Sequence, residues 1–211
     1  MKKYNIILLL LAFIVPLLVA SCSEEDNSVE EFPDWKNRNE AYFSDVWNTA
    51  KENADGSWKL FLSYALEDTV PTTVDDYIAV QVLEEGAGSG CPMFTDSVRI
   101  SYRGRLIPST SYVDGYVFDQ TYSGEYNSET ARPQDMYVGS FVDGFATALQ
   151  HMHIGDHWRV YIPYMLGYGS SGTTTIPAYS TLVFDIALVA YCRADGSLGP
   201  TRSAESVWIT E

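Results

Sequence analysis

The chain has 211 residues and carries 28 acidic against 13 basic side chains, which gives a formal net charge of −15. This surplus of negative charge repels phosphate groups, whereas nucleic-acid-binding proteins display a basic stripe, so nucleic acid is excluded as a partner. The length suits a single core of about 115 residues with extensions at both ends.

The first residues have the pattern of a secretion signal. Lys2 and Lys3 precede an apolar run from Ile6 to Ala20, which is too short for a membrane-spanning helix and contains Pro16. We therefore predict that residues 1–21 are a signal peptide, removed from the mature protein. Its removal takes away two lysines and no acidic residue, so the net charge falls from −15 to −17.

The segment Leu18-Val-Ala-Ser-Cys22 resembles the lipobox of bacterial lipoproteins, in which the peptidase cuts before the cysteine and the thiol carries diacylglycerol. The resemblance implies lipidation of Cys22 and a protein anchored to a bacterial membrane in the cell envelope, which we expect to be the outer membrane. A plain signal peptide followed by a coincidental cysteine is the alternative. Residues 22–32 form an acidic tether that is similar to a surface-export signal, with a simple flexible spacer as the alternative.

A helical extension is predicted over residues 33–75. Pro33 suits the first turn of a helix, and Asp55-Gly56 ends it as a turn. A short apolar run at Trp58–Tyr64 indicates an additional strand. Between Pro33 and Asn53, apolar residues recur at helical spacing and form one face that packs on the main domain: Trp35, Tyr42, Phe43, Val46, Trp47 and Ala50.

From Tyr77 onwards apolar residues recur at every second position, which is typical of half-buried strands. Thr181–Tyr191 is apolar on both sides, as in a central strand. One short helix interrupts the strands, with Phe145, Leu149 and Met152 on its buried face. These elements predict an α+β domain over residues 76–192, in which a sheet wraps one helix. Residues 193–211 are predicted to be a tail in which only Trp208 packs back. The alternating strand segments are 78–83, 98–103 and 158–162.

One glycine-rich pattern and one group of histidines have the spacing of functional motifs. Gly167-Tyr-Gly-Ser-Ser-Gly172 has the spacing of a dinucleotide fingerprint, but three threonines and a proline follow it where a helix has to begin. His151, His153 and His157 span a helix end and a turn and not one strand face, which favours a solvated turn over a zinc site. We predict neither metal nor cofactor.

Two cysteines, Cys91 and Cys192, remain if Cys22 is lipidated. An oxidising compartment permits them to form a disulfide, but their separation is not defined by the sequence, so pairing stays open.

Seven short segments between Tyr77 and Tyr191 resemble, in order and spacing, the FKBP-type peptidyl-prolyl isomerases. The resemblance implies a twisted antiparallel β-sheet wrapped on a short α-helix, with a hydrophobic hollow between them that holds a proline residue. An aspartate such as Asp119 is by itself most often a turn residue. Only its place within the family's pattern of segments assigns it to the site. The segments are Val98–Leu106, Val117–Gln120, Phe141–Phe145, Met152–Gly155, Tyr168-Gly169, Ile176-Pro177 and Thr181–Asp185.

The same resemblance implies the residues of the site. Asp119, Tyr168 and Tyr102 take the catalytic positions, and Phe145 forms the floor, where the family usually has tryptophan. Gln134 lies nearest to a wall position that is often aromatic. The substrate-binding positions are Phe118, Phe141, Val142, Phe145, Ile176 and Phe184.

Two further differences from the family lie at the edge of the site. Thr175 replaces a common aliphatic residue beside Ile176, and the polar segment Tyr122–Arg132 is long enough to modify access to the hollow.

The implied activity is noncovalent rotation of X-Pro bonds in proline-containing polypeptides, which requires no cofactor and assists protein folding. The alternative is a binding or chaperone module that kept the hollow and lost efficient catalysis.

Overall fold

The computed structural model describes residues 30–67, 72–194 and 208–211. Residues Glu31–Glu211 form one compact unit. The predicted signal peptide, Cys22 and most of the acidic tether lie outside the described residues. No helix in the described ranges is long and apolar enough to cross a membrane.

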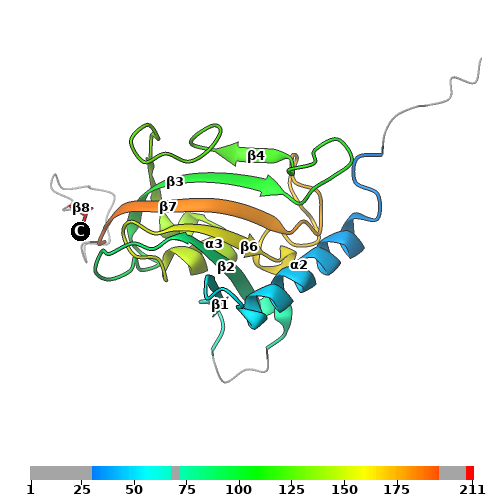
Figure 1. Cartoon of the computed structure of the whole chain (residues 1–211), viewed down its shortest axis with the longest axis horizontal. Coiled ribbons are helices and arrows are strands. Elements are labelled where there is room, and N and C mark those ends of the chain that lie inside the picture. The colour runs from blue at the N-terminus through cyan, green and yellow to red at the C-terminus, as the bar shows by residue number, and fades with distance from the viewer. Residues whose placement is uncertain (1–29, 68–71, 195–207) are drawn as a thin grey trace, which may run out of the picture. The chain divides into compact units, whose positions relative to one another are not determined.

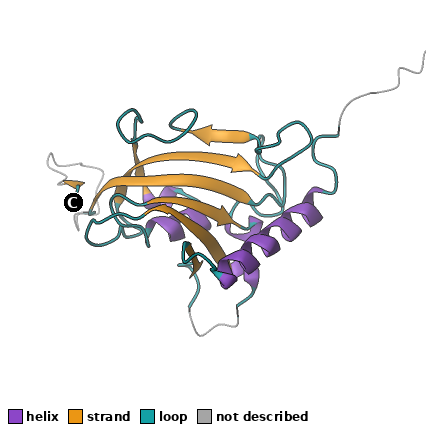
Figure 2. Cartoon of the chain, in the orientation of Figure 1, coloured by secondary structure: helices purple, strands orange, loops and turns teal. Residues whose placement is uncertain are grey.

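The core of the molecule is one twisted sheet in which every described pairing is antiparallel (Figures 1 and 2). Its strand order is β1-β2-β6-β7-β3-β4, with β5 also paired to β3 and β8 to β7. The α+β class and the antiparallel sheet wrapped on a short helix are therefore confirmed. The strands are β1 (Trp58–Leu62), β2 (Tyr77–Glu84), β3 (Ser97–Leu106), β4 (Val117–Gln120), β5 (Gln134–Tyr137), β6 (His157–Ile162), β7 (Leu182–Cys192) and β8 (Trp208–Ile209).

Strand β7 lies between β6 and β3 and is buried on both sides, as predicted for a central strand, although it carries one charged residue, Asp185. One side of the sheet packs on helix α3 (Asp143–Leu149), whose Phe145 and Leu149 are fully buried against Trp158 and Ile186. Met152 is buried as well, but it follows the helix, because the chain leaves α3 through a tight turn in which the Met152 N–H donates to the Leu149 carbonyl.

Helix α2 (Trp35–Glu52) covers part of the opposite side of the sheet (Figure 1). Its buried Phe43 and Ala50 pack on Ala79, Tyr161 and Val183, which alternate with the residues that face α3. The predicted N-terminal helix is thus confirmed. Burial of this aromatic face, and not intrinsic propensity, stabilises the helix against the sheet.

The end of the chain returns to the sheet, as predicted for Trp208. Trp208 pairs with Cys192 at the end of β7, and the Arg99 guanidinium lies 4.5 Å from its indole centroid. Cys91 and Cys192 are both free thiols.

The three histidines do not form one solvated turn. His151 stacks on Phe61 with ring centroids 4.1 Å apart, and His157 is the first residue of β6 and packs on Tyr126. Only His153 lies in the turn between α3 and β6, where its side chain is 48% exposed.

One buried amide connects α2 to the sheet, and its loss should destabilise the fold. Asn39 is fully buried, donates to the Trp35 carbonyl and accepts from the Thr181 N–H at 2.7 Å. Asn39→Ala leaves that N–H unsatisfied, so we expect the free energy of unfolding to fall by about 1–3 kcal/mol in urea denaturation. Asn37→Ala removes only an exposed bond to Asp34 and serves as the control; equal losses from both variants would contradict this assignment.

Candidate functional site

A hollow of about 390 Å³ opens on the α3 side of the sheet. Aromatic and aliphatic side chains from β3, β4, β5, β7, α3 and the loop after β6 line it, and polar groups stand at its rim. The lining residues are Tyr102, Phe118, Asp119, Met136, Ser140, Phe141, Val142, Phe145, Tyr168, Thr173, Thr175, Ile176 and Phe184.

Four rings form the floor. Phe145 is fully buried at the start of α3, and its ring meets that of Phe184 edge to face with centroids 4.9 Å apart. Phe141 stacks on Phe145 at 4.2 Å, and Tyr102 meets it edge to face at 5.9 Å. Edge-to-face contacts place the positive edge of one ring on the negative face of the next, so the floor is apolar and rigid.

A glycine on β3 allows the rings to approach the strand. A Cβ at Gly104 would overlap the rings of both Phe184 and Phe118. Only glycine therefore permits this arrangement. Gly104 therefore sets the depth of the hollow at its β3 wall.

The β4 strand directs two successive residues to the same hollow. Asp119 lies opposite Gly104, and the pairing shifts between Gly104 and Arg105. Such a β-bulge breaks strict alternation, which explains why Phe118 and Asp119 both line the site.

A hydrogen bond joins the floor to the rim. The Tyr102 hydroxyl donates to Asp119 Oδ2 at 2.7 Å, and Asp119 is exposed while Tyr102 is buried. Burial and this carboxylate raise the pKa of Tyr102 well above its ordinary value, so the phenol stays protonated at neutral pH. The bond orients the Asp119 carboxylate over the mouth of the hollow.

The loop after β6 supplies the opposite rim. Tyr168 follows the 3-10 turn Tyr164–Leu166 and is 39% exposed, and its hydroxyl has no hydrogen-bond partner in the described ranges. The Ile176 N–H donates to Thr173 Oγ1 at 3.0 Å, which closes the loop on itself. The Tyr168 hydroxyl is therefore free to donate to a bound molecule.

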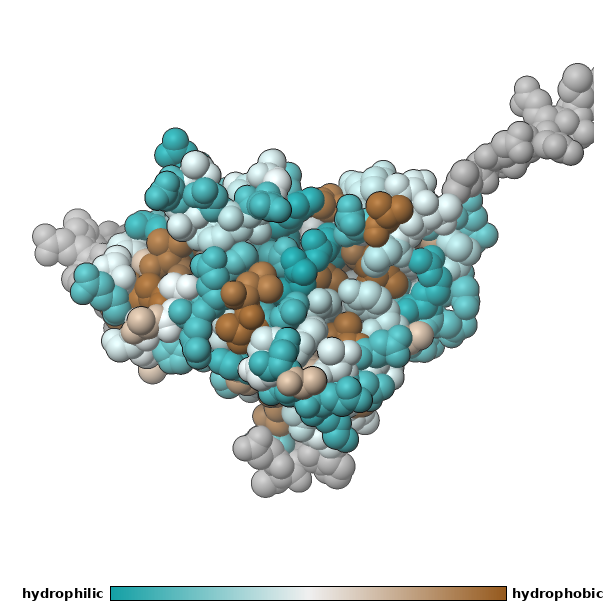
Figure 3. Space-filling view, viewed as in Figure 1, coloured by the Kyte–Doolittle hydropathy of each residue, from teal (hydrophilic) through white to brown (hydrophobic). Residues whose placement is uncertain are grey.

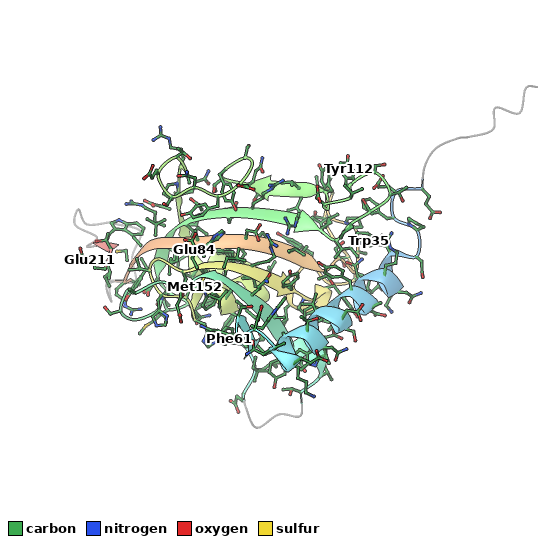
Figure 4. All side chains as sticks on the ribbon, viewed as in Figure 1. Trp35, Phe61, Glu84, Tyr112, Met152 and Glu211 are labelled. Atoms are coloured by element: carbon green, nitrogen blue, oxygen red, sulfur yellow. The ribbon has the colours of Figure 1, made fainter. Side chains whose placement is uncertain are left out.

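Helix α2 holds this loop in place. The Trp35 indole N–H donates to Ser180 Oγ at 2.9 Å, and Ser180 in turn donates to the Pro177 carbonyl at 2.7 Å. Figure 4 shows Trp35 at the end of α2 beside this loop. The Lys36 ammonium also lies 5.0 Å from the Tyr179 ring centroid. The N-terminal helix thus supports one wall of the hollow.

All nine residues implied by the resemblance lie in the lining of this one hollow. Their catalytic and binding roles stay predictions. The residues that sequence reasoning missed are Met136, Ser140 and Thr173. Met136 follows Gln134 by two along β5 and so shares its face, which is the signal that points to it.

The structure places the two rim features in which the sequence differs from the family. Gln134 is exposed and does not line the hollow; Met136 fills that wall, one strand repeat further along β5. None of the residues of Tyr122–Arg132 lines it either. That segment lies on the α2 side of the sheet, where the Gly124 carbonyl accepts from Arg103 and Tyr126 packs on His157.

The hollow is suited to a small apolar ring with a neighbouring carbonyl. Its floor offers dispersion contacts, and its rim offers a tyrosine hydroxyl and a carboxylate. In the ranges that the structure describes, no group of three or more His, Cys, Asp or Glu could hold a metal ion.

The model of the FKBP-type peptidyl-prolyl cis-trans isomerases matches residues 89–189. The macrophage infectivity potentiator of Trypanosoma cruzi is 33% identical over 150 residues, which cover 71% of this chain and 68% of that protein. The FKBP-type 22 kDa peptidyl-prolyl cis-trans isomerase of Escherichia coli K12 is 36% identical over 110 residues, 52% of this chain and 47% of that protein. The chain thus spans about two thirds of the trypanosome protein and about half of the bacterial one.

A solved structure, a peptidyl-prolyl cis-trans isomerase from Pseudomonas syringae, is also similar. It is 28% identical with a TM-score of 0.49, and the match covers 72% of this chain and 95% of that one.

Gly104→Ala tests the geometry of the floor. The added methyl group must displace the Phe118 and Phe184 rings, so we expect the free energy of unfolding to fall by about 1–3 kcal/mol. The NMR signals of both rings should shift, while those of Phe43, on the other side of the sheet, stay unchanged. Unmoved signals of Phe118 and Phe184 would show that Gly104 does not limit the hollow.

Proposed function

Because the chain belongs to the FKBP-type peptidyl-prolyl cis-trans isomerase family, we propose that it catalyses the rotation of X-Pro peptide bonds in polypeptides that fold in the bacterial cell envelope. The observation that carries the proposal is the convergence of nine residues from six separate segments on one ring-walled hollow. A hollow of this size accepts a proline ring, and its rim accepts the preceding carbonyl.

The reaction needs no nucleophile. Rotation about the peptide bond has a barrier of about 18–20 kcal/mol because twisting sacrifices amide resonance. The twisted amide is less charge-separated than the planar one, so an apolar site favours the twisted form. The rings of Phe145 and Phe184 supply that site, and both are almost completely buried.

Two polar groups act on the rotating carbonyl in this proposal, and a third positions one of them. The Tyr168 hydroxyl, which has no partner in the described part of the chain, donates to the substrate carbonyl near Ile176. The Asp119 carboxylate acts electrostatically as the carbonyl turns, and Tyr102 holds it in position through the 2.7 Å hydrogen bond. Tyr102 is in this sense a positioning residue.

The proposed location rests on the N-terminal sequence. Lysines, an apolar run and the segment that ends at Cys22 support lipidation and attachment to a bacterial membrane, for which we propose the outer membrane. The acidic tether that follows gives the isomerase unit reach from the membrane surface.

The isomerase proposal predicts measurable losses on substitution. In a proline-peptide isomerisation assay on the chain from Ser23 to Glu211, Asp119→Ala and Tyr168→Phe should each lower kcat/KM about tenfold, which is about 1.4 kcal/mol of transition-state stabilisation. Tyr164→Phe is the matched control, because Tyr164 packs on Tyr179 away from the hollow and should retain full activity.

Filling the hollow provides a stronger test. Val142→Trp places a large ring in the space meant for proline and should abolish turnover while the fold persists. Background-level rates for the unsubstituted chain and all variants alike would leave only the binding module.

The anchor has its own test. Cys22→Ala should abolish incorporation of radiolabelled palmitate and release the protein from the membrane fraction, because the thioether that carries diacylglycerol cannot form. Cys91→Ala is the control and should keep both properties. Membrane attachment that survives Cys22→Ala would rule out the lipid anchor.

A further inference from the structure

A second pocket, of about 430 Å³, lies on the α2 side of the sheet. Three arginines from β3 and β6 line it, and we call it the guanidinium pocket: Arg103, Arg105 and Arg159, with Tyr42, Leu106, Pro108, Val113, Asp114 and Val183. Figure 3 looks onto this side of the molecule and shows hydrophilic residues gathered over the middle of the sheet, where β3 and β7 run. The hollow described above opens on the other side.

Strand register brings the charges together. Arg103 lies opposite Asp185 on β7, and Asp185 lies opposite Arg159 on β6, so the three side chains form a row across the sheet. Arg159 donates to both carboxylate oxygens of Asp185, at 2.6 and 3.2 Å. The Asp185 carboxylate therefore lies among several guanidinium groups, and both of its oxygens already accept a hydrogen bond from one of them.

Arg105 is left with unused donors. Its nearest carboxylate oxygen is Asp185 Oδ2 at 3.8 Å, which is too long for a hydrogen bond, and no other ion pair or hydrogen bond of its side chain occurs in the described ranges. Its side chain is 21% exposed, and its ion-pair partner Asp185 is hydrogen-bonded to Arg159. The Arg105 guanidinium therefore keeps donors that line the pocket and that a ligand can reach.

Arg103 adds to the surplus of donors. It donates through Nη1 to the Gly124 carbonyl at 3.1 Å, but its Nε is shielded from water and has no partner among the described residues. Asp114 also lines the pocket, yet it forms no ion pair within 4 Å there. The positive field of Arg105 and Arg159 reaches the Tyr42 phenol, where it opposes the rise in pKa that burial causes.

We propose that the guanidinium pocket binds an oxyanion, either a carboxylate on an acidic side chain of a polypeptide or a free phosphate. The planar fork of arginine matches both groups with two parallel hydrogen bonds. Arg105 is the principal donor, and Tyr42, Leu106 and Pro108 provide an apolar edge for the atoms that carry the anion. In a chain of net charge −15, the pocket is a local reversal of sign that selects acidic ligands.

The pocket is independent of the hollow, although they share a strand. Tyr102 and Gly104 face the hollow, and Arg103 and Arg105, which alternate with them, face the guanidinium pocket. A ligand without proline therefore tests this site alone.

The test uses two probes at low ionic strength, sodium phosphate and the peptide acetyl-Gly-Ala-Glu-Ala-Gly-amide, followed through the arginine Nε–H signals of the ¹⁵N-labelled protein. At least one probe should shift the Arg105 signal, and Arg105→Gln should weaken that binding about tenfold. Arg99→Gln removes the same charge from the same strand, but Arg99 is paired with Asp135 outside the pocket, and this variant should bind normally.

A second variant covers the case in which Arg105→Gln fails to fold. Val113 is 78% exposed at the pocket edge, so Val113→Glu leaves the ion network intact and should weaken binding by placing a competing carboxylate there.

The source of the anion follows from which probe binds. Binding of the peptide, with loss when its glutamate is replaced by glutamine, identifies an acidic polypeptide segment, and binding of phosphate alone identifies a small free anion. The proposal is overturned if neither probe binds at millimolar concentration. It is also overturned if Arg99→Gln weakens binding as much as Arg105→Gln, because net charge would then be the cause.

Discussion

The edge-to-face contact between Phe145 and Phe184 determines the position of the other parts of the site. The two rings join helix α3 to strand β7 near the centre of the sheet, with centroids 4.9 Å apart. The position of Phe184 in turn requires a strand without a side chain at Gly104, because a methyl group there would overlap the Phe184 and Phe118 rings. The floor of the hollow is therefore a consequence of how the core packs, and the rim groups are added to a surface that is already rigid.

Strand β3 contributes to two different pockets because its successive side chains point to opposite sides of the sheet. Tyr102 and Gly104 face an apolar hollow with a few polar groups at its mouth, and Arg103 and Arg105 face a pocket of opposite character. A strand buried on one side and charged on the other is possible only because α2 leaves part of its side of the sheet uncovered. The charges there remain partly solvated, and Asp185 neutralises some of them.

The N-terminal helix contributes to the hollow from the far side of the sheet. Its first turn holds Ser180 through Trp35, and Asn39 holds the backbone at Thr181, directly before β7. Both contacts lie at the end of the loop that carries Tyr168 and Ile176. The extension is thus connected to the rim by hydrogen bonds that are buried and therefore strongly directional.

The features that the sequence predicts correctly are local in the chain. Alternating apolar residues predicted β3, β6 and β7, helical spacing predicted α2, and the ordered segments around Phe118-Asp119 and Tyr168 named nine residues that line one hollow. Each of these signals is a short-range periodicity or a motif, which a chain carries in its order of residues.

Sequence reasoning did not place Met136 on the wall, left the position of Tyr122–Arg132 undefined, and overlooked the convergence of Arg103, Arg105 and Arg159. Those three features depend on strand register, on a β-bulge and on the packing of a loop against His157. The two-residue alternation of apolar side chains in the sequence specifies none of them. The sequence by itself determined which residues are apolar, which alternate and where the ring motifs lie. Only the tertiary structure decided which distant residues meet, because contacts between strands are set by pairing and close packing across the whole sheet.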